Sequence, residues 1–97
     1  MLKIGLGSGG VVVIEGRLDA AQAAAAQAFL DGVGGDVVLD CSALEYLSSA
    51  GLGVLLKTQK RLKAAAGQLR LTGVNRHVHD IFRYAGFDQI FQITAAP

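Results

Sequence analysis

The sequence contains one cysteine, one proline and no tryptophan in 97 residues. Cys41 therefore has no partner for a disulfide within the chain, and the first residues, Met1 to Gly5, show no signal-peptide pattern, so we expect a cytoplasmic protein. Nine basic and eight acidic residues give a net charge of +1, which favours no nucleic-acid partner. The longest apolar tract, 20–30, is too short to cross a bilayer, so direct membrane insertion is not expected.

Glycine, by contrast, is abundant. The 13 glycines lie mostly between short apolar runs, which predicts tight turns and no flexible linker. A chain of this length buries somewhat over about 60% of its unfolded surface, enough for a hydrophobic core without metals or disulfides. We therefore expect a single domain over residues 1–97.

The central stretch, 36–67, predicts a strand, a loop and a long helix. Val37–Leu39 is an apolar run closed by Asp40, which is typical of a strand buried on both faces. From Leu52 onward, leucines recur at helical spacing with basic residues between them, and Gly67 is expected to end this helix. In the loop, Ser42 and Glu45 have the spacing of a capping box for one isolated helical turn.

The other segments predict strands and helices in alternation. Asp19 is expected to cap a helix that reaches about Leu30, with Gln22 as its capping-box partner, and Asn75 to cap another that ends at Gly86. Strands are expected at 2–6, 11–14, 69–72 and 90–93. The predicted fold is α/β, in the order β-β-α-β-α-β-α-β, with a mixed sheet that begins with a β-hairpin, continues with parallel strands and has helices packed against it.

Two serines, Ser48 and Ser49, stand where the long helix begins. Either side chain can cap the helix by accepting a hydrogen bond from a free amide of the first turn. The free amides and the helix dipole also make this end favourable for a phosphate group. On residue types alone, simple capping and a phosphate-bearing site both remain open.

The sequence shows no recognisable catalytic arrangement. Gly5, Gly7 and Gly10 match G-x-G-x-x-G, but a strand follows them where dinucleotide binding needs a helix. His77 and His79 are two residues apart, which places them on different faces of a helix and argues against a metal pair. We therefore expect no enzyme activity, no cofactor and no bound metal.

Asp40-x-Ser42 followed by the run 46–56, YLSSAGLGVLL, resembles the signature of the STAS domain, the fold of bacterial anti-sigma factor antagonists. Gly16-x-Leu18-Asp19 is similar to the loop that lies beside the modified residue in that family. By position, the resemblance implies that Ser49 is the serine phosphorylated by a partner kinase. Two positions differ from the family pattern: Ser48 replaces the usual acidic residue, and Ala50 stands where many members have Ser or Thr.

The resemblance implies an anti-sigma factor antagonist that acts by partner switching. The unphosphorylated form would bind an anti-sigma factor that is also a serine kinase, phosphorylation of Ser49 would release it, and a serine phosphatase of the metal-dependent type would restore it. ATP and the divalent metal belong to those partners. The alternative is a STAS subunit of a membrane transport ATPase assembly, permanently bound and not phosphorylated. The predicted partner-binding residues are Leu18, Asp19, Asp40, Ser42, Ser48, Ser49, Ala50, Gly51, Leu52 and Val54.

Overall fold

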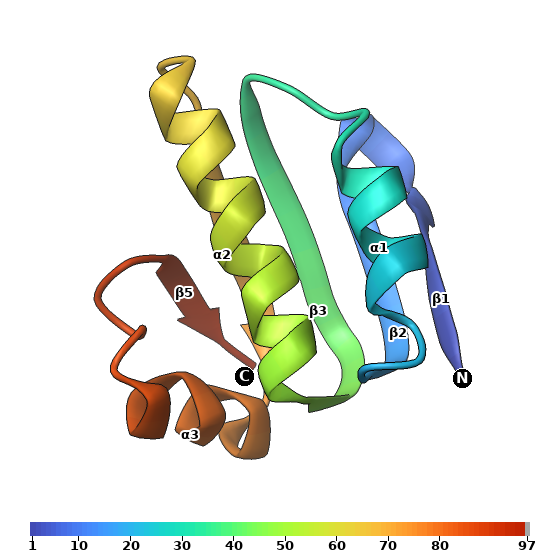
Figure 1. The fold of residues 1–97 in the computed structure, drawn as a ribbon, viewed down its shortest axis with the longest axis vertical. Coiled ribbons are helices and arrows are strands. Elements are labelled where there is room, and N and C mark those ends of the chain that lie inside the picture. Colours follow the sequence, from blue (N-terminus) through green and yellow to red (C-terminus); the bar gives the residue numbers. More distant parts are fainter. Residues whose placement is uncertain (97) are drawn as a thin grey trace.

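The computed structural model describes residues 1–96, which form a five-stranded sheet and three α-helices (Figure 1). The strands lie in the order β1-β2-β3-β4-β5, with β1 antiparallel to β2 and all other neighbours parallel. This confirms the predicted mixed sheet that begins with a hairpin. The elements are β1 (Leu2–Leu6), β2 (Val12–Leu18), α1 (Ala23–Leu30), β3 (Asp36–Leu47), α2 (Ser49–Ala64), β4 (Gln68–Val74), α3 (Arg76–Ala85) and β5 (Gln92–Ala95), with a short 3-10 turn at Ser8–Gly10 in the hairpin.

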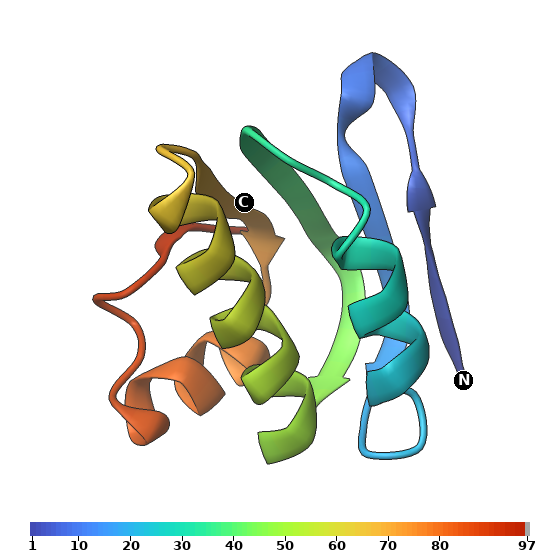
Figure 2. The same ribbon diagram turned by 45° about the horizontal axis from the view of Figure 1, so that its top comes forward.

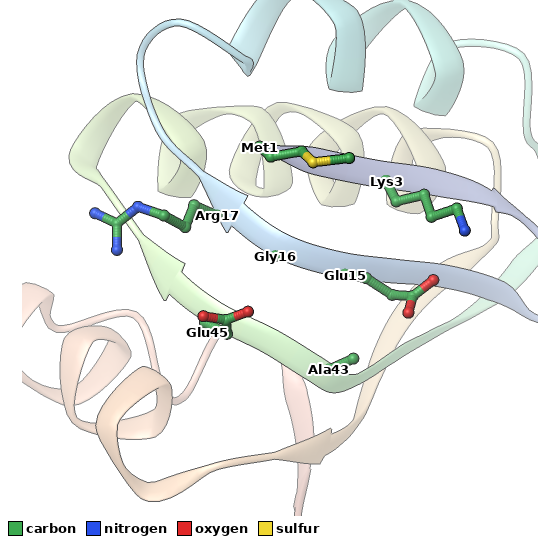
Figure 3. A pocket seen from close by; sticks show the side chains of 7 residues that line it. All are labelled: Met1, Lys3, Glu15, Gly16, Arg17, Ala43 and Glu45. Atoms are coloured by element: carbon green, nitrogen blue, oxygen red, sulfur yellow. The ribbon is translucent and has the colours of Figure 1, made fainter.

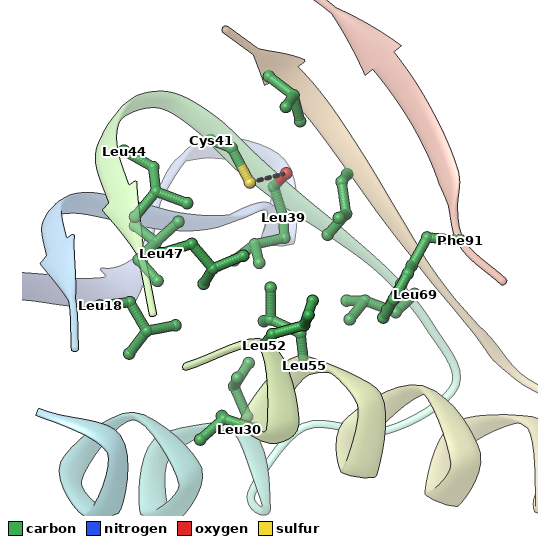
Figure 4. Packing of buried hydrophobic residues seen from close by; sticks show 14 of the residues in the cluster. Leu18, Leu30, Leu39, Cys41, Leu44, Leu47, Leu52, Leu55, Leu69 and Phe91 are labelled. Atoms are coloured by element: carbon green, nitrogen blue, oxygen red, sulfur yellow. Dashed lines mark hydrogen bonds between the residues drawn. The ribbon is translucent and has the colours of Figure 1, made fainter. Parts of the chain in front are cut away.

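Helices α1 and α2 lie side by side over one face of the sheet, and α3 lies near the end of the sheet where β3 ends (Figures 1 and 2). The core fills the space between these helices and the sheet (Figure 4). Most of its large side chains are leucines from both the sheet and the helices, such as Leu18, Leu39 and Leu55, all fully buried. In the described part of the chain, no helix combines the length and the apolar composition that crossing a membrane would require.

Strand β3 is longer than predicted. It continues through Asp40 to Leu47, so the expected strand end at Asp40 and the isolated helical turn at Ser42 and Glu45 are wrong. Relative to β2, β3 contains one extra residue between Asp40 and Ala43 and a second after Leu44. Such bulges interrupt the alternation of apolar and polar residues, which is why a paired strand resembles a loop in the sequence.

Helix α1 begins at Ala23, later than predicted. The carbonyl of Asp19 accepts the N–H of Gln22 at 3.1 Å, which closes a turn ahead of the helix. Gln22 then occupies the N-cap position without a side-chain hydrogen bond. The prediction that Asp19 caps this helix with Gln22 as its partner is therefore wrong, and the Asp19 carboxylate is free for another role.

Helix α2 ends at Ala64, and the turn that follows does not use Gly67 as predicted. Ala66 is the residue in the left-handed region, with φ of 64°, while the N–H of Gly67 donates to the carbonyl of Leu62 at 2.7 Å. Gly67 is required for another reason, because a Cβ at this position would overlap the carbonyl oxygen of Gly35. The glycine permits close approach of two loops and does not provide the left-handed turn.

Helix α3 has the ends that its sequence predicts. The Asn75 side chain accepts a hydrogen bond from the N–H of Val78 at 2.8 Å, and Gly86 ends the helix in the left-handed region. Strand β5 starts at Gln92 and not at 90, because Phe91 turns into the core and packs edge-on against Phe82 at 5.3 Å between ring centroids.

Candidate functional site at the start of helix α2

The N-terminus of α2 is held against the end of β2 by Ser48. Its N–H donates to the carbonyl of Leu18 at 3.0 Å, and its Oγ accepts the N–H of Gly51 at 3.2 Å. Ser48 is thus the N-cap of α2, and its hydroxyl is committed to holding the first turn. Of the two serines that could cap the helix, Ser48 does so.

Ser49 is the first residue of α2 and is exposed. Its hydroxyl makes no hydrogen bond with any described residue. Ala50, which follows, is also exposed and adds only a methyl group to the surface. A free hydroxyl therefore stands at the positive end of the longest helix.

Four of the predicted partner-binding residues form the base of this site. Leu18 is fully buried, Leu52 and Val54 are each 6% exposed, and Gly51 is buried as well. A Cβ on Gly51 would overlap the carbonyl oxygen of Leu18 and would lie 2.7 Å from the Leu18 Cγ. These residues set the position of Ser49 and offer little side-chain surface of their own.

Asp19 lies next to this base, directly after Leu18. It is half-buried, and its Oδ1 atom is buried without a hydrogen-bond partner among residues 1–96. An unpaired buried carboxylate oxygen is costly unless something supplies a donor. The residue before Asp19, Leu18, accepts the Ser48 N–H, so Asp19 lies at the same end of the sheet as Ser48, as the resemblance implied.

Asp40 and Ser42 lie elsewhere. Leu39 and Cys41, on either side of Asp40, are buried under the helices, so Asp40 points to the opposite face of the sheet. Ser42 stands five positions before Leu47, the last residue of β3, up to about 16 Å at the rise of a β-strand. The Ser42 side chain and main-chain N–H both hydrogen-bond to the Asp40 carboxylate, the N–H at 2.9 Å from Oδ1. These hydrogen bonds lower the pKa of Asp40. The two residues pair with each other and do not join Ser49.

A shallow groove of about 340 Å³ runs between α1 and α2, next to Ala50. The groove was not predicted from the sequence, although the small residues on both helices are a signal for it. Small side chains at these positions leave a hollow between the helices that larger side chains would fill. The lining residues are Ala23, Ala24, Gln27, Ala50, Gly53, Val54 and Lys57.

The face of the sheet opposite α1 and α2 also contains a hollow, at its β1–β2 side (Figure 3). Its charges are mixed, with two basic and two acidic side chains, so it has no preference for one sign of ligand. Within the described residues, no three His, Cys, Asp or Glu side chains gather as metal ligands. The lining residues are Met1, Lys3, Glu15, Gly16, Arg17, Ala43 and Glu45.

Three side chains stack where β2 and β3 end. The guanidinium carbon of Arg17 lies 4.3 Å from the centroid of the Tyr46 ring, and the Tyr46 ring stacks on His77 with centroids 6.4 Å apart and planes 25° apart. This group, here called the Arg17 stack, was not predicted from the sequence. Its members come from β2, β3 and α3, and nothing in the local pattern connects them.

Cys41 is not available for nucleophilic chemistry. Its side chain is 1% exposed beneath the helices (Figure 4), where the thiol points to the carbonyl of Leu39 at 3.6 Å. Burial, together with the neighbouring charge of Asp40, raises the pKa of the thiol to about 12. The thiolate is therefore absent at neutral pH.

Comparison with known proteins gives a family match over most of the chain. The family model described as "Mlab, STAS domain" matches residues 5–94. Among curated proteins, BtrV of Bordetella bronchiseptica, named as an anti-sigma factor antagonist, is 44% identical over 57 residues. The match covers 59% of this chain and 49% of BtrV, so the matched segment spans about half the length of this relative.

Solved structures share the fold at lower identity. An anti-sigma factor antagonist from Mycobacterium paratuberculosis superposes with a TM-score of 0.78 at 24% identity, covering 97% of this chain and 84% of that one. The Bacillus protein SpoIIAA, in its unphosphorylated form, gives a TM-score of 0.71 at 19% identity, covering 100% of this chain and 90% of that one. At these identities the likeness establishes the architecture.

Proposed function

Because the chain belongs to the STAS domain family, a family of regulatory binding domains, we propose that it is an anti-sigma factor antagonist that acts by partner switching. The unphosphorylated protein binds an anti-sigma factor that is also a serine kinase. Phosphorylation of Ser49 ends the complex, and a metal-dependent serine phosphatase restores the binding form. The exposed, unbonded hydroxyl of Ser49 at the start of α2 is the observation that carries this proposal.

The geometry favours Ser49 over Ser48 as the phosphorylated residue. Ser48 is half-buried, and its Oγ accepts the Gly51 N–H, so a kinase would have to break the helix cap to reach it. Ser49 is exposed and needs no such rearrangement. The proposed docking surface is formed by Ser49 and Ala50, with the half-buried Asp19 and Ser48 at its edge.

The switch acts on the docking surface and leaves the fold unchanged. A phosphoserine carries about −1.5 to −2 charges, and the end of a helix stabilises such a group by only about 0.3–2 kcal/mol, too little to refold a domain. A hundredfold loss of affinity requires about 2.8 kcal/mol. Removing a dianion from water at an interface, next to the Asp19 carboxylate, supplies a penalty of that size.

Two Ser49 variants and one control test the charge switch. Each anti-sigma-factor-type kinase of the genome that encodes this chain is titrated with wild type, Ser49→Ala, Ser49→Asp and Ser8→Asp. We expect binding by wild type, Ser49→Ala and Ser8→Asp, and loss of binding by Ser49→Asp alone. Ser8 is an exposed serine in the β1–β2 hairpin, at the other end of β2 from the site, so its variant controls for added negative charge. Equal affinity of Ser49→Ala and Ser49→Asp would contradict the switch.

Phosphorylation itself is tested by mass spectrometry after incubation with the binding kinase and ATP. We expect one added phosphate on wild type and on Ser48→Ala, and none on Ser49→Ala. A chain that binds its partner but gains no phosphate would instead behave as a permanently bound subunit, as in the transport-assembly alternative.

A further inference from the structure

The Arg17 stack has unused hydrogen-bonding capacity. The guanidinium face of Arg17 rests on Tyr46, but its N–H groups make no hydrogen bond with any described residue. Within residues 1–96, the only ion pair joins Arg83 to Asp80 at 3.7 Å, so Arg17 is also without a carboxylate partner. Arg17 is exposed, and Figure 3 shows it directed away from Lys3 and Glu15.

The stack holds Arg17 in place. Its main-chain N–H donates to the carbonyl of Met1 at 2.9 Å, which fixes the backbone, and Tyr46 supports the flat face of the guanidinium. Tyr46 is in turn supported by His77. A guanidinium held by its face presents its edge, whose paired N–H groups match the two oxygens of a carboxylate. Less entropy is lost on binding because the side chain is already ordered.

The stack lies within reach of the Ser49 surface. Tyr46 precedes Ser49 by three residues, so their Cα atoms are no more than about 11 Å apart. The carbonyl of Leu18, the residue after Arg17, accepts the Ser48 N–H. Arg17 lies on the face of the sheet opposite α2, but at the end of the sheet where α2 begins. A standard interface of about 800 Å² per partner is roughly 30 Å across, so a partner that covers this end of the sheet would contact both Ser49 and the stack.

We propose that the Arg17 stack is a second contact for the partner kinase and that it receives a carboxylate side chain of that protein. The inference rests on the proposed function, because it takes the same partner. The edge of Arg17 accepts the carboxylate in a bidentate pair, and Arg76, exposed at the start of α3 next to His77, adds positive charge to the same end of the molecule. The neighbouring carboxylate, Glu45, is not ion-paired with Arg17 and leaves it available.

The kinase that binds wild type is titrated with Arg17→Gln, Arg17→Lys and Tyr46→Leu at about 50 mM and about 300 mM salt. We expect Arg17→Gln to weaken binding about tenfold or more, with a smaller salt dependence than wild type. Arg17→Lys should bind more tightly than Arg17→Gln but less tightly than wild type, because lysine keeps the charge without the bidentate geometry of the guanidinium. Tyr46→Leu should weaken binding while Arg17 is still present, which a role of charge alone would not produce.

Arg70→Gln is the control. Arg70 is exposed on β4, outside the stack, and its loss should change affinity by less than about twofold. If wild type binds and Arg17→Gln binds equally well, or if Arg70→Gln loses as much as Arg17→Gln, this inference is overturned while the Ser49 switch stands. If wild type binds no such kinase, the proposed function fails and the inference falls with it.

Discussion

Gly51 packs directly against the main-chain carbonyl of Leu18, so the first turn of α2 lies on the end of β2 with no side chain between them. The Ser48 N–H donates to that same carbonyl. One oxygen atom thus fixes where the helix begins, and with it the position of Ser49. The phosphorylation proposed for Ser49 would act on a rigid end and not on a mobile loop.

Replacing Gly51 with alanine should destabilise the protein. The new Cβ would overlap the Leu18 carbonyl, and strain of this kind costs about 1–3 kcal/mol in a packed site. Gly53→Ala is the matched control, because a Cβ there has open space and alanine favours the helix by about 0.5–1 kcal/mol. Urea unfolding of both variants measures the difference. If both alanines stabilise the fold, the close contact at Gly51 does not exist.

The two serines should differ in their effect on stability. Ser48→Ala removes the N-cap of α2 and should lower the free energy of unfolding by about 0.5–2 kcal/mol. Ser49→Ala removes a hydroxyl that makes no hydrogen bond with the described residues, so it should change the free energy of unfolding by less than about 0.5 kcal/mol. Thermal unfolding of the two single variants makes the comparison. A larger loss for Ser49→Ala would show that Ser49 is the cap.

Local pattern predicted the order of elements because each is encoded by nearby residues. The apolar run in β2, the leucine spacing in α2 and the Asn75 cap are features of single segments. The length of β3 could not be predicted in this way, since its two extra residues are defined only by pairing with β2. The Asp19 cap failed because its carbonyl, not its carboxylate, organises the turn before α1.

The site was predicted in part for the same reason. Ser48 and Ser49 could be located because the start of a helix is a local feature. The Arg17 stack could not be found, because it joins residues 17, 46 and 77 from three elements. Asp40 and Ser42 were grouped with Ser49 by a linear motif, yet they lie several residues before the end of β3 and pair with each other.

The turn after α2 offers a test of why a glycine stands there. Ala66 has φ of 64°, a region where a Cβ costs about 1–2 kcal/mol, so Ala66→Gly should stabilise the protein by up to about that amount. Gly67→Ala should destabilise it, because its Cβ would overlap the Gly35 carbonyl. Melting temperatures of the two variants should therefore move in opposite directions. If Gly67 served as the left-handed residue, Ala66→Gly would bring no gain.

Cys41 should make the protein less stable in alkali. The folded thiol has its pKa raised to about 12 by burial, whereas the ordinary value is 9.0. Between these values the unfolded chain has lost this proton and the folded chain has kept it, so stability falls as pH rises, by about 1.4 kcal/mol per pH unit. Below pH 9.0 the thiol is protonated in both states and the effect vanishes.

Urea unfolding of wild type and Cys41→Ala from pH 8 to 10.5 isolates this contribution, since the tyrosines and lysines are common to both. The stability difference between the two proteins should narrow above pH 9.0. A constant difference over this range, or rapid labelling of the native thiol by a disulfide reagent at pH 8, would mean that Cys41 is not sealed beneath the helices.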